Sequence, residues 1–268
     1  MKTTVTKRMS KKAIFAKYGI LYNNGMIFCE YLNMWINLLL VNGNQKIGKG
    51  CYHFSTLPTM NIFNVIINGI EYAVKGTCKC NCIGCYATKG NYNFPSVIKA
   101  LAIRTILIRN DLAFVENAIM AQIESENIQL CRIHASGDFD SIEYAMMWHR
   151  ITKHFSNCAF WTYTKVKECE NIFADVPNAN IVKSVIHGFG YNYGHCEYIL
   201  TVYNALKAMG KDVYICRCGI DKNQHCTNCK GCSKNEYVLF IEHSTEYVAE
   251  NDPFYPVIVK LIESQKAI

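Results

Sequence analysis

The chain has 268 residues, 50% of them hydrophobic and 18% charged, so it can bury a globular core and is not a disordered protein. Its formal net charge of +7 is concentrated in residues 1–17, which carry six Lys and Arg residues and no acidic residue. The remainder is close to neutral, which argues against a basic nucleic-acid-binding face on the body of the protein.

The N-terminal part, residues 1–64, is expected to be a basic arm followed by a helical or irregular extension. The arm is read as a solvated terminus, with nucleic acid as its alternative partner. The apolar stretch 26–41 is too short to span a bilayer, and Glu30, Asn33 and Asn37 interrupt it. Its spacing predicts a buried amphipathic helix. With no secretory pattern either, we expect a cytoplasmic protein without a membrane partner.

Strand-like and helix-like segments alternate from residue 65 onward. Residues 65–76 predict a strand, or a short hairpin turning at Asn68-Gly69, and residues 94–126 predict a helix that breaks near Asn110. The later segments are a strand and turn at 129–138, helices at 141–155, 195–210 and 253–267, and strands at 158–165, 178–186, 211–216 and 236–242. This order predicts an α/β fold, a partial (β/α) barrel of about six parallel strands over 65–268.

Nine of the fifteen cysteines fall in two short windows, at 78–85 and 216–232. Without an export signal this distribution favours metal binding over disulfides. The remaining six lie singly, several in apolar surroundings where a thiol behaves as a small hydrophobe: Cys29, Cys51, Cys131, Cys158, Cys169 and Cys196.

The first window contains C-x3-C-x2-C, formed by Cys78, Cys82 and Cys85. Three thiolates on one tight loop can hold three irons of a [4Fe–4S] cluster and leave the fourth iron open. A structural zinc ion closes with four ligands, usually drawn as pairs from separated segments, and remains the alternative. Cys80 alternates with its neighbours and is expected to point away.

The second window contains C-x2-C-x2-C, formed by Cys226, Cys229 and Cys232. This spacing is found in cluster-binding ferredoxins. Cys218 is the expected fourth ligand and Cys216 the weaker candidate. Four ligands would make this cluster structural or electron-transferring, and a closed four-thiolate zinc site is again the alternative.

Polar residues alternate along the strand "CRIHAS" that precedes the turn Ser136-Gly137-Asp138. Arg132, His134 and Ser136 are expected on one face, which would make the barrel interior polar. Loops after strands carry the functional residues in such barrels.

A C-x3-C-x2-C loop after the first strand of a (β/α) barrel resembles the radical SAM (S-adenosylmethionine) superfamily. The resemblance implies that Cys78, Cys82 and Cys85 hold a [4Fe–4S] cluster whose open iron is chelated by SAM. Reduction of the cluster then cleaves SAM to a 5′-deoxyadenosyl radical. The electron donor would be a flavodoxin or ferredoxin.

The same resemblance places Ser136, Gly137 and Asp138 where the superfamily has a Gly-Gly-Glu motif that binds the amino group of SAM. Gly84 stands where the superfamily has an aromatic residue, and Tyr86 follows the third cysteine instead. The expected cofactor-binding residues are those of the turn, the tyrosine and the preceding strand: Ser136, Gly137, Asp138, Tyr86, Arg132 and His134.

Four segments together resemble the phage-borne gene product 88 family: "CIGCYA", "RIHASGDFDSIEYAMMWHRI", "FWTYTK" and the late cysteines before "VLFIEH". That family occurs on phages and mobile elements. Two functions follow as hypotheses: a radical SAM enzyme with two clusters, or a non-enzymatic iron–sulfur or zinc protein with a redox-sensing or nucleic-acid-associated role.

Overall fold

The computed structural model describes residues 9–43, 47–79, 85–183, 193–217, 220–221, 223–229, 231–241 and 248–265. The chain divides into two compact units. Unit 1 comprises Met1–Val41, Phe54–Gln129 and Ala135–Ile151, and unit 2 comprises Asn42–His53, Leu130–His134 and Thr152–Ile268.

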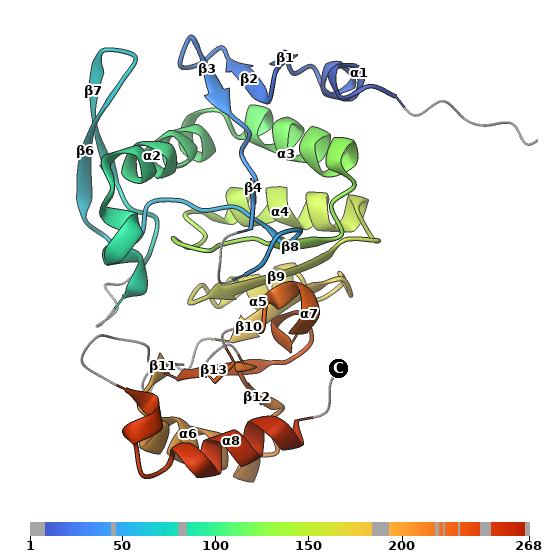
Figure 1. The fold of residues 1–268 in the computed structure, drawn as a ribbon. Coiled ribbons are helices and arrows are strands. Elements are labelled where there is room, and N and C mark those ends of the chain that lie inside the picture. Colours follow the sequence, from blue (N-terminus) through green and yellow to red (C-terminus); the bar gives the residue numbers. More distant parts are fainter. Residues whose placement is uncertain are drawn as a thin grey trace, which may run out of the picture. The chain divides into compact units, whose positions relative to one another are not determined.

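Unit 1 starts with a helix and a three-stranded antiparallel sheet, namely α1 Lys11–Lys17, β1 Tyr22–Asn23, β2 Met26–Cys29 and β3 Met34–Asn37 (Figure 1). The prediction of a helix over 26–41 is therefore wrong. Asn24 and Gly25 adopt φ values of 46° and 83°, and Asn33 adopts 48°. These positive φ values form tight turns, and Ile27 and Cys29 alternate with half-buried neighbours at a period of two.

A second antiparallel pair, β6 Ile62–Ile67 and β7 Ile70–Lys75, confirms the hairpin alternative for 65–76. Its turn residues Asn68 and Gly69 have φ values of 49° and 78°, as a type I′ turn requires. Within the described ranges this pair forms a sheet of its own. The segment that leads into the first cysteine window is thus not a strand of the parallel sheet.

The helical segment 94–126 is confirmed as α2 Pro95–Asn110 and α3 Leu112–Glu126. Pro95 occupies the first turn of α2, where its missing N–H does no harm. Asp111 separates the two helices, and its side chain accepts a hydrogen bond from the Phe114 N–H at 3.2 Å, which caps α3. The next predicted helix is α4 Ile142–His154.

The main sheet of unit 2 has the order β10-β9-β8-β5-β4. Its strands are β4 Val41–Asn42, β5 Tyr52–His53, β8 Leu130–Arg132, β9 Ala159–Thr164 and β10 Ala179–Lys183. From β5 to β10 the neighbours are parallel and follow the chain order. The short helix α5 Glu168–Ile172 connects β9 to β10.

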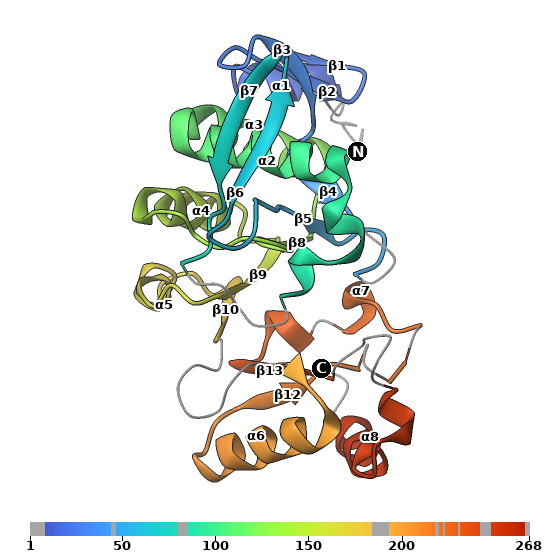
Figure 2. The same cartoon turned by 90° about the vertical axis from the view of Figure 1, so that its left-hand side faces the viewer.

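A second parallel sheet in unit 2 has the order β11-β13-β12. It consists of β11 Tyr193–Gly194, β12 Val213–Ile215 and β13 Tyr237–Ile241. Helices α6 Cys196–Ala208 and α8 Tyr255–Ser264 bury Ile199, Val202 and Ile258 in one core with this sheet (Figure 2). The Lys183 N–H donates to the Glu236 carbonyl at 2.9 Å, which joins the end of β10 to the start of β13.

Of the helices in the described ranges, none combines the length and apolar character that crossing a bilayer requires.

Candidate metal centres

The second cysteine window surrounds a pocket in unit 2. Four thiols line it: those of Cys216, Cys226, Cys229 and Cys232, together with Trp161, Gly231 and Ser233. Cys216 follows β12, and its N–H continues the sheet ladder by donating to the Leu239 carbonyl at 2.8 Å. The other three come from α7 Cys226–Cys229 and the 3-10 turn Gly231–Ser233. Cys218, the expected fourth ligand, lies outside the described residues.

One asparagine holds the turn that carries Cys232 to the main sheet, and a second closes the turn on itself. The Asn180 side chain, on β10, donates to the carbonyls of Cys232 at 2.8 Å and Asn235 at 2.9 Å. The buried Asn235 amide donates to the Gly231 carbonyl at 2.7 Å. Because each amide satisfies backbone carbonyls of the turn, the position of Cys232 is fixed by strand β10.

Two tyrosines neighbour thiols of the pocket. The Tyr214 hydroxyl lies 3.0 Å from the Sγ of Cys229. Cys232 is a neighbour of Tyr163, and after burial its thiol contributes to raising the pKa of that tyrosine. Burial, followed by the neighbouring cysteine, raises the pKa of both tyrosines, which therefore keep their protons.

Four cysteines on one pocket are a donor set that an iron–sulfur cluster would use. Among the described residues, no group of three or more His, Cys, Asp or Glu side chains is gathered in the way one metal ion requires. A [4Fe–4S] cluster takes each thiolate on a different iron atom, so its ligands stand around a larger space. In addition, the Nδ1 atom of His225, directly before Cys226, is buried without a hydrogen-bond partner in the described ranges, which makes it a further candidate donor.

The first cysteine loop is fastened at both of its described ends in unit 1. The N–H groups of Thr77 and Cys78 donate to the carbonyls of Leu57 at 2.9 Å and Thr59 at 3.2 Å. Cys78 and Cys85 are both partly exposed. The Tyr86 hydroxyl, on the 3-10 turn Tyr86–Thr88, donates to the Ala135 carbonyl. Cys80 and Cys82 lie outside the described residues.

The predicted SAM-binding turn lies against this loop. The N–H of Asp138 donates to Thr77 Oγ1 at 3.0 Å, and Ser136 Oγ donates to the Thr56 carbonyl at 2.7 Å. Gly137 adopts a φ of 80°, and a Cβ there would meet Thr77 Oγ1 at 2.7 Å. Ser136 and Gly137 therefore build the turn, and the Asp138 N–H joins it to Thr77, the residue before Cys78.

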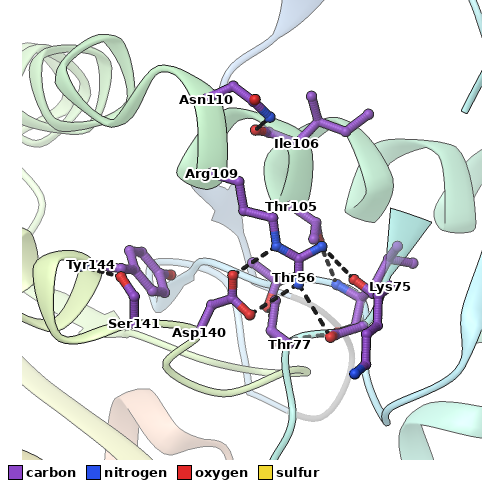
Figure 3. Close-up of polar contacts among 12 residues, drawn as sticks. Thr56, Lys75, Thr77, Thr105, Ile106, Arg109, Asn110, Asp140, Ser141 and Tyr144 are labelled. Atoms are coloured by element: carbon purple, nitrogen blue, oxygen red, sulfur yellow. Dashed lines mark hydrogen bonds and ion pairs between the residues drawn. The ribbon is translucent and has the colours of Figure 1, made fainter. Parts of the chain in front are cut away.

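Arg109 on α2 connects the same loop to the segment after the turn. Its guanidinium donates to both oxygens of Asp140, at 2.7 and 2.9 Å, and to the carbonyls of Lys75 at 2.7 Å and Gly76 at 3.2 Å (Figure 3). The Lys79 ammonium donates to the Asp140 carbonyl at 2.6 Å. Sequence analysis did not single out either member of this ion pair, because no motif contains both.

Arg132 and His134 belong to unit 2, where they contact each other and the main sheet. Arg132 Nε donates to the His134 carbonyl at 2.6 Å, and its guanidinium lies 4.9 Å from the centre of the Tyr163 ring. His134 is 2% exposed, and its Nδ1 lies 3.2 Å from Thr162 Oγ1. Burial, and then the charge of Arg132, lowers the pKa of His134 to about 3. The imidazole is therefore neutral.

The six scattered cysteines are all buried, which confirms their reading as small hydrophobic residues. Burial raises the pKa of Cys51 to about 12, and raises those of Cys131 and Cys158 as well. A buried thiol with a raised pKa is a poor nucleophile and a poor metal ligand. These six thiols also lie outside the pocket lining, which contains Cys216, Cys226, Cys229 and Cys232.

Comparison with known families decides the membership of the chain. The model of the gene product 88 family matches residues 38–235. The chain belongs to the gene product 88 family. This confirms the resemblance to a phage gene product family that the sequence motifs indicated. The region shared with other gene product 88 proteins includes both cysteine windows and the Ser136-Gly137-Asp138 turn. No curated protein and no solved structure matches this gene product 88 chain.

Proposed function

We propose that this gene product 88 protein is an iron–sulfur protein that holds a cluster between Cys216, Cys226, Cys229 and Cys232. The observation that carries the proposal is the convergence of these four thiols on one pocket of unit 2. Trp161 in its wall and the Tyr214 hydroxyl 3.0 Å from the Sγ of Cys229 would give such a cluster apolar, hydrogen-bonded surroundings. Cys216 is the described residue that would serve as fourth ligand, and Cys218, the ligand expected from the sequence, lies outside the described residues.

The proposal includes a second [4Fe–4S] cluster on the first loop, held by Cys78, Cys82 and Cys85 with one iron open to SAM. It is supported by the contacts that hold Thr77 and Tyr86 against the turn around Gly137. The sequential parallel order of β5, β8, β9 and β10 supports the partial (β/α) barrel that radical SAM enzymes use. When bound and reduced, such a cluster supplies one electron to SAM.

Within unit 1, this chain's own residues would orient SAM. The Asp138 carboxylate is 6% exposed and accepts the Phe139 N–H at 2.8 Å, which fixes its position beside the loop. A carboxylate held in this way suits the amino group of SAM. Tyr86, 53% exposed beside Cys85, is available to pack on a nucleoside.

The test is anaerobic reconstitution of the full chain with iron and sulfide, followed by metal analysis and electron paramagnetic resonance with and without SAM. We expect iron and sulfide in the protein and a signal of the reduced cluster that changes when SAM is added. Zinc without iron would overturn the cluster proposal. A cluster signal that does not change when SAM is added would overturn the radical SAM hypothesis but not the cluster proposal.

Cysteine variants assign the ligands in the same experiment. Cys216→Ser should remove the iron of the unit 2 cluster, whereas Cys218→Ser should retain it. In the first loop, Cys82→Ala should remove the iron and Cys80→Ala should retain it. The reverse result in either pair would refute that ligand assignment.

A non-enzymatic role in electron transfer or redox sensing is the second candidate. One observation favours it: the unit 2 pocket offers four thiols, which would close a cluster and leave no iron free for a substrate. A protein with this cluster alone would bind iron at unit 2 and show no response to SAM.

A further inference from the structure

Tyr214 is fixed from two sides beside the pocket. Its side chain is 4% exposed, and its hydroxyl lies 3.0 Å from the Sγ of Cys229. On the other side its ring packs on the backbone of Gly231, where a Cβ would lie only 2.7 Å from Cζ. Only glycine at position 231 allows so close an approach, so the hydroxyl is held toward Cys229.

Tyr163 is the corresponding neighbour of Cys232. Its ring packs edge-on against Phe240 at a centroid distance of 5.5 Å, and after burial the neighbouring Cys232 thiol contributes to raising its pKa. The guanidinium of Arg132 lies 4.9 Å from the ring centre, while its Nε is bound to the His134 carbonyl. A cation over the ring draws electron density from it, which makes the hydroxyl a stronger hydrogen-bond donor.

The direction of a hydrogen bond between a hydroxyl and a cysteine depends on the state of the sulfur. A free thiol can donate or accept, but a thiolate bound to iron has no proton and only accepts. In the loaded protein both tyrosines can therefore only donate. We propose that the hydroxyls of Tyr163 and Tyr214 donate to the cluster-bound sulfurs of Cys232 and Cys229 and raise the reduction potential of the unit 2 cluster. This inference rests on the proposed cluster.

The effect on the potential follows from charge. A reduced cluster carries one more electron than the oxidised cluster, so a hydrogen bond to its sulfur stabilises the reduced state more. The pocket wall contains Trp161, and the buried Tyr214 reaches Cys229 in that wall, so a low local dielectric would strengthen each such bond. The cluster then accepts one electron from weaker donors than an unassisted cluster would require.

The experiment is a dye-mediated dithionite titration of the full chain, followed by electron paramagnetic resonance. A Cys82→Ala background removes the cluster of the first loop and isolates the unit 2 signal. Tyr163→Phe and Tyr214→Phe should each lower the ratio of reduced to oxidised cluster at a fixed potential about tenfold, ~59 mV for a one-electron couple. The double variant should shift further. Tyr203→Phe is the matched control, because Tyr203 lies on α6 and packs in the core that α6 and α8 form with the second sheet. The potential should not shift in this variant.

Arg132→Gln tests the effect of the cation beside the Tyr163 ring, because it leaves both tyrosine hydroxyls in place. It should shift the potential in the same direction as Tyr163→Phe, because the ring then loses the cation that lies 4.9 Å from its centre. If Tyr214→Phe fails to retain iron, Tyr163→Phe and Arg132→Gln still decide the outcome.

Unchanged potentials in iron-loaded variants would overturn this inference and leave the cluster proposal standing. A parent protein without iron, or with zinc, would overturn the cluster proposal itself and this inference with it.

Discussion

Arg109 holds Asp140 through two hydrogen bonds from one guanidinium, and with its remaining N–H groups binds the backbone that enters the first cysteine loop. A planar fork of five donors makes this arrangement possible, and lysine cannot reproduce it. The pair thus couples the start of the loop to the segment after the Gly137 turn.

We predict that Arg109→Lys lowers the stability of the protein by about 1 kcal/mol, a modest value because both side chains are partly exposed. It should also reduce the iron bound by the first loop. Arg150→Lys is the matched control, since Arg150 binds Glu116 in the same two-pronged way, between α4 and α3. Equal iron loss in the two variants, measured after anaerobic reconstitution, would show that the effect is not specific to the loop.

Gly137 is predicted to tolerate no side chain. Its φ of 80° is strained for any L-residue, and a Cβ would also overlap Thr56 Oγ1 and meet Thr77 Oγ1 at 2.7 Å. Gly137→Ala should lower the free energy of unfolding by about 3 kcal/mol, measured by urea titration. Gly69→Ala separates the two causes, because Gly69 has a φ of 78° with nothing within 4 Å of its Cβ position. It should cost about 1 kcal/mol, and equal losses in the two variants would refute the packing argument.

Much of the local structure was readable from the sequence, and the exceptions have physical reasons. Asn68-Gly69 predicted a hairpin because few other dipeptides adopt two positive φ values in succession. The helix prediction for residues 26–41 was wrong because the apolar residues of this segment suit a helix and a strand equally. The turns at Asn24-Gly25 and Asn33 decide in favour of strands.

The sequence predicted only those parts of the candidate sites that lie within one continuous segment. Cysteine spacing identified both windows, but the end of β12 determines that Cys216 reaches the pocket. Tyr163, Asn180 and Tyr214 contact the cysteine segment from three different strands. Side chains so far apart in sequence form no motif, and only the folding of the two sheets of unit 2 brings them together.

Asn180 is predicted to position the cysteine turn of the proposed unit 2 cluster. Asn180→Ala removes the hydrogen bonds to the carbonyls of Cys232 and Asn235, which should cost about 1–2 kcal/mol and lower the metal bound per chain. Asn178→Ala is the matched control, because the Asn178 amide satisfies the carbonyls of Thr152, Phe155 and Cys158 instead.

Both asparagine variants should lose similar stability in a urea titration, while only Asn180→Ala should lose metal after anaerobic reconstitution. Unaltered metal content in Asn180→Ala would show that the turn holds Cys232 without help from β10.

His134 gives a prediction for the pH dependence of stability. Burial, and then the charge of Arg132, lowers its pKa from the usual 6.5 to about 3. Between these values the unfolded chain binds a proton at this residue and the folded chain does not. The free energy of unfolding therefore falls as the pH falls below 6.5, by about 1.4 kcal/mol for each pH unit, and the loss stops near pH 3.

In His134→Gln this contribution is absent, so urea titrations at pH 7.5 and 5.0 should show the advantage of the parent protein shrinking by about 2 kcal/mol. Thr162→Val is the matched control: it removes the hydroxyl 3.2 Å from Nδ1 but keeps the buried imidazole, and so should keep the pH dependence of the parent. Comparing variants cancels the acid sensitivity of every other group that they share. Parallel losses in His134→Gln and the parent would mean that the folded protein accepts a proton at His134 as readily as the unfolded chain does.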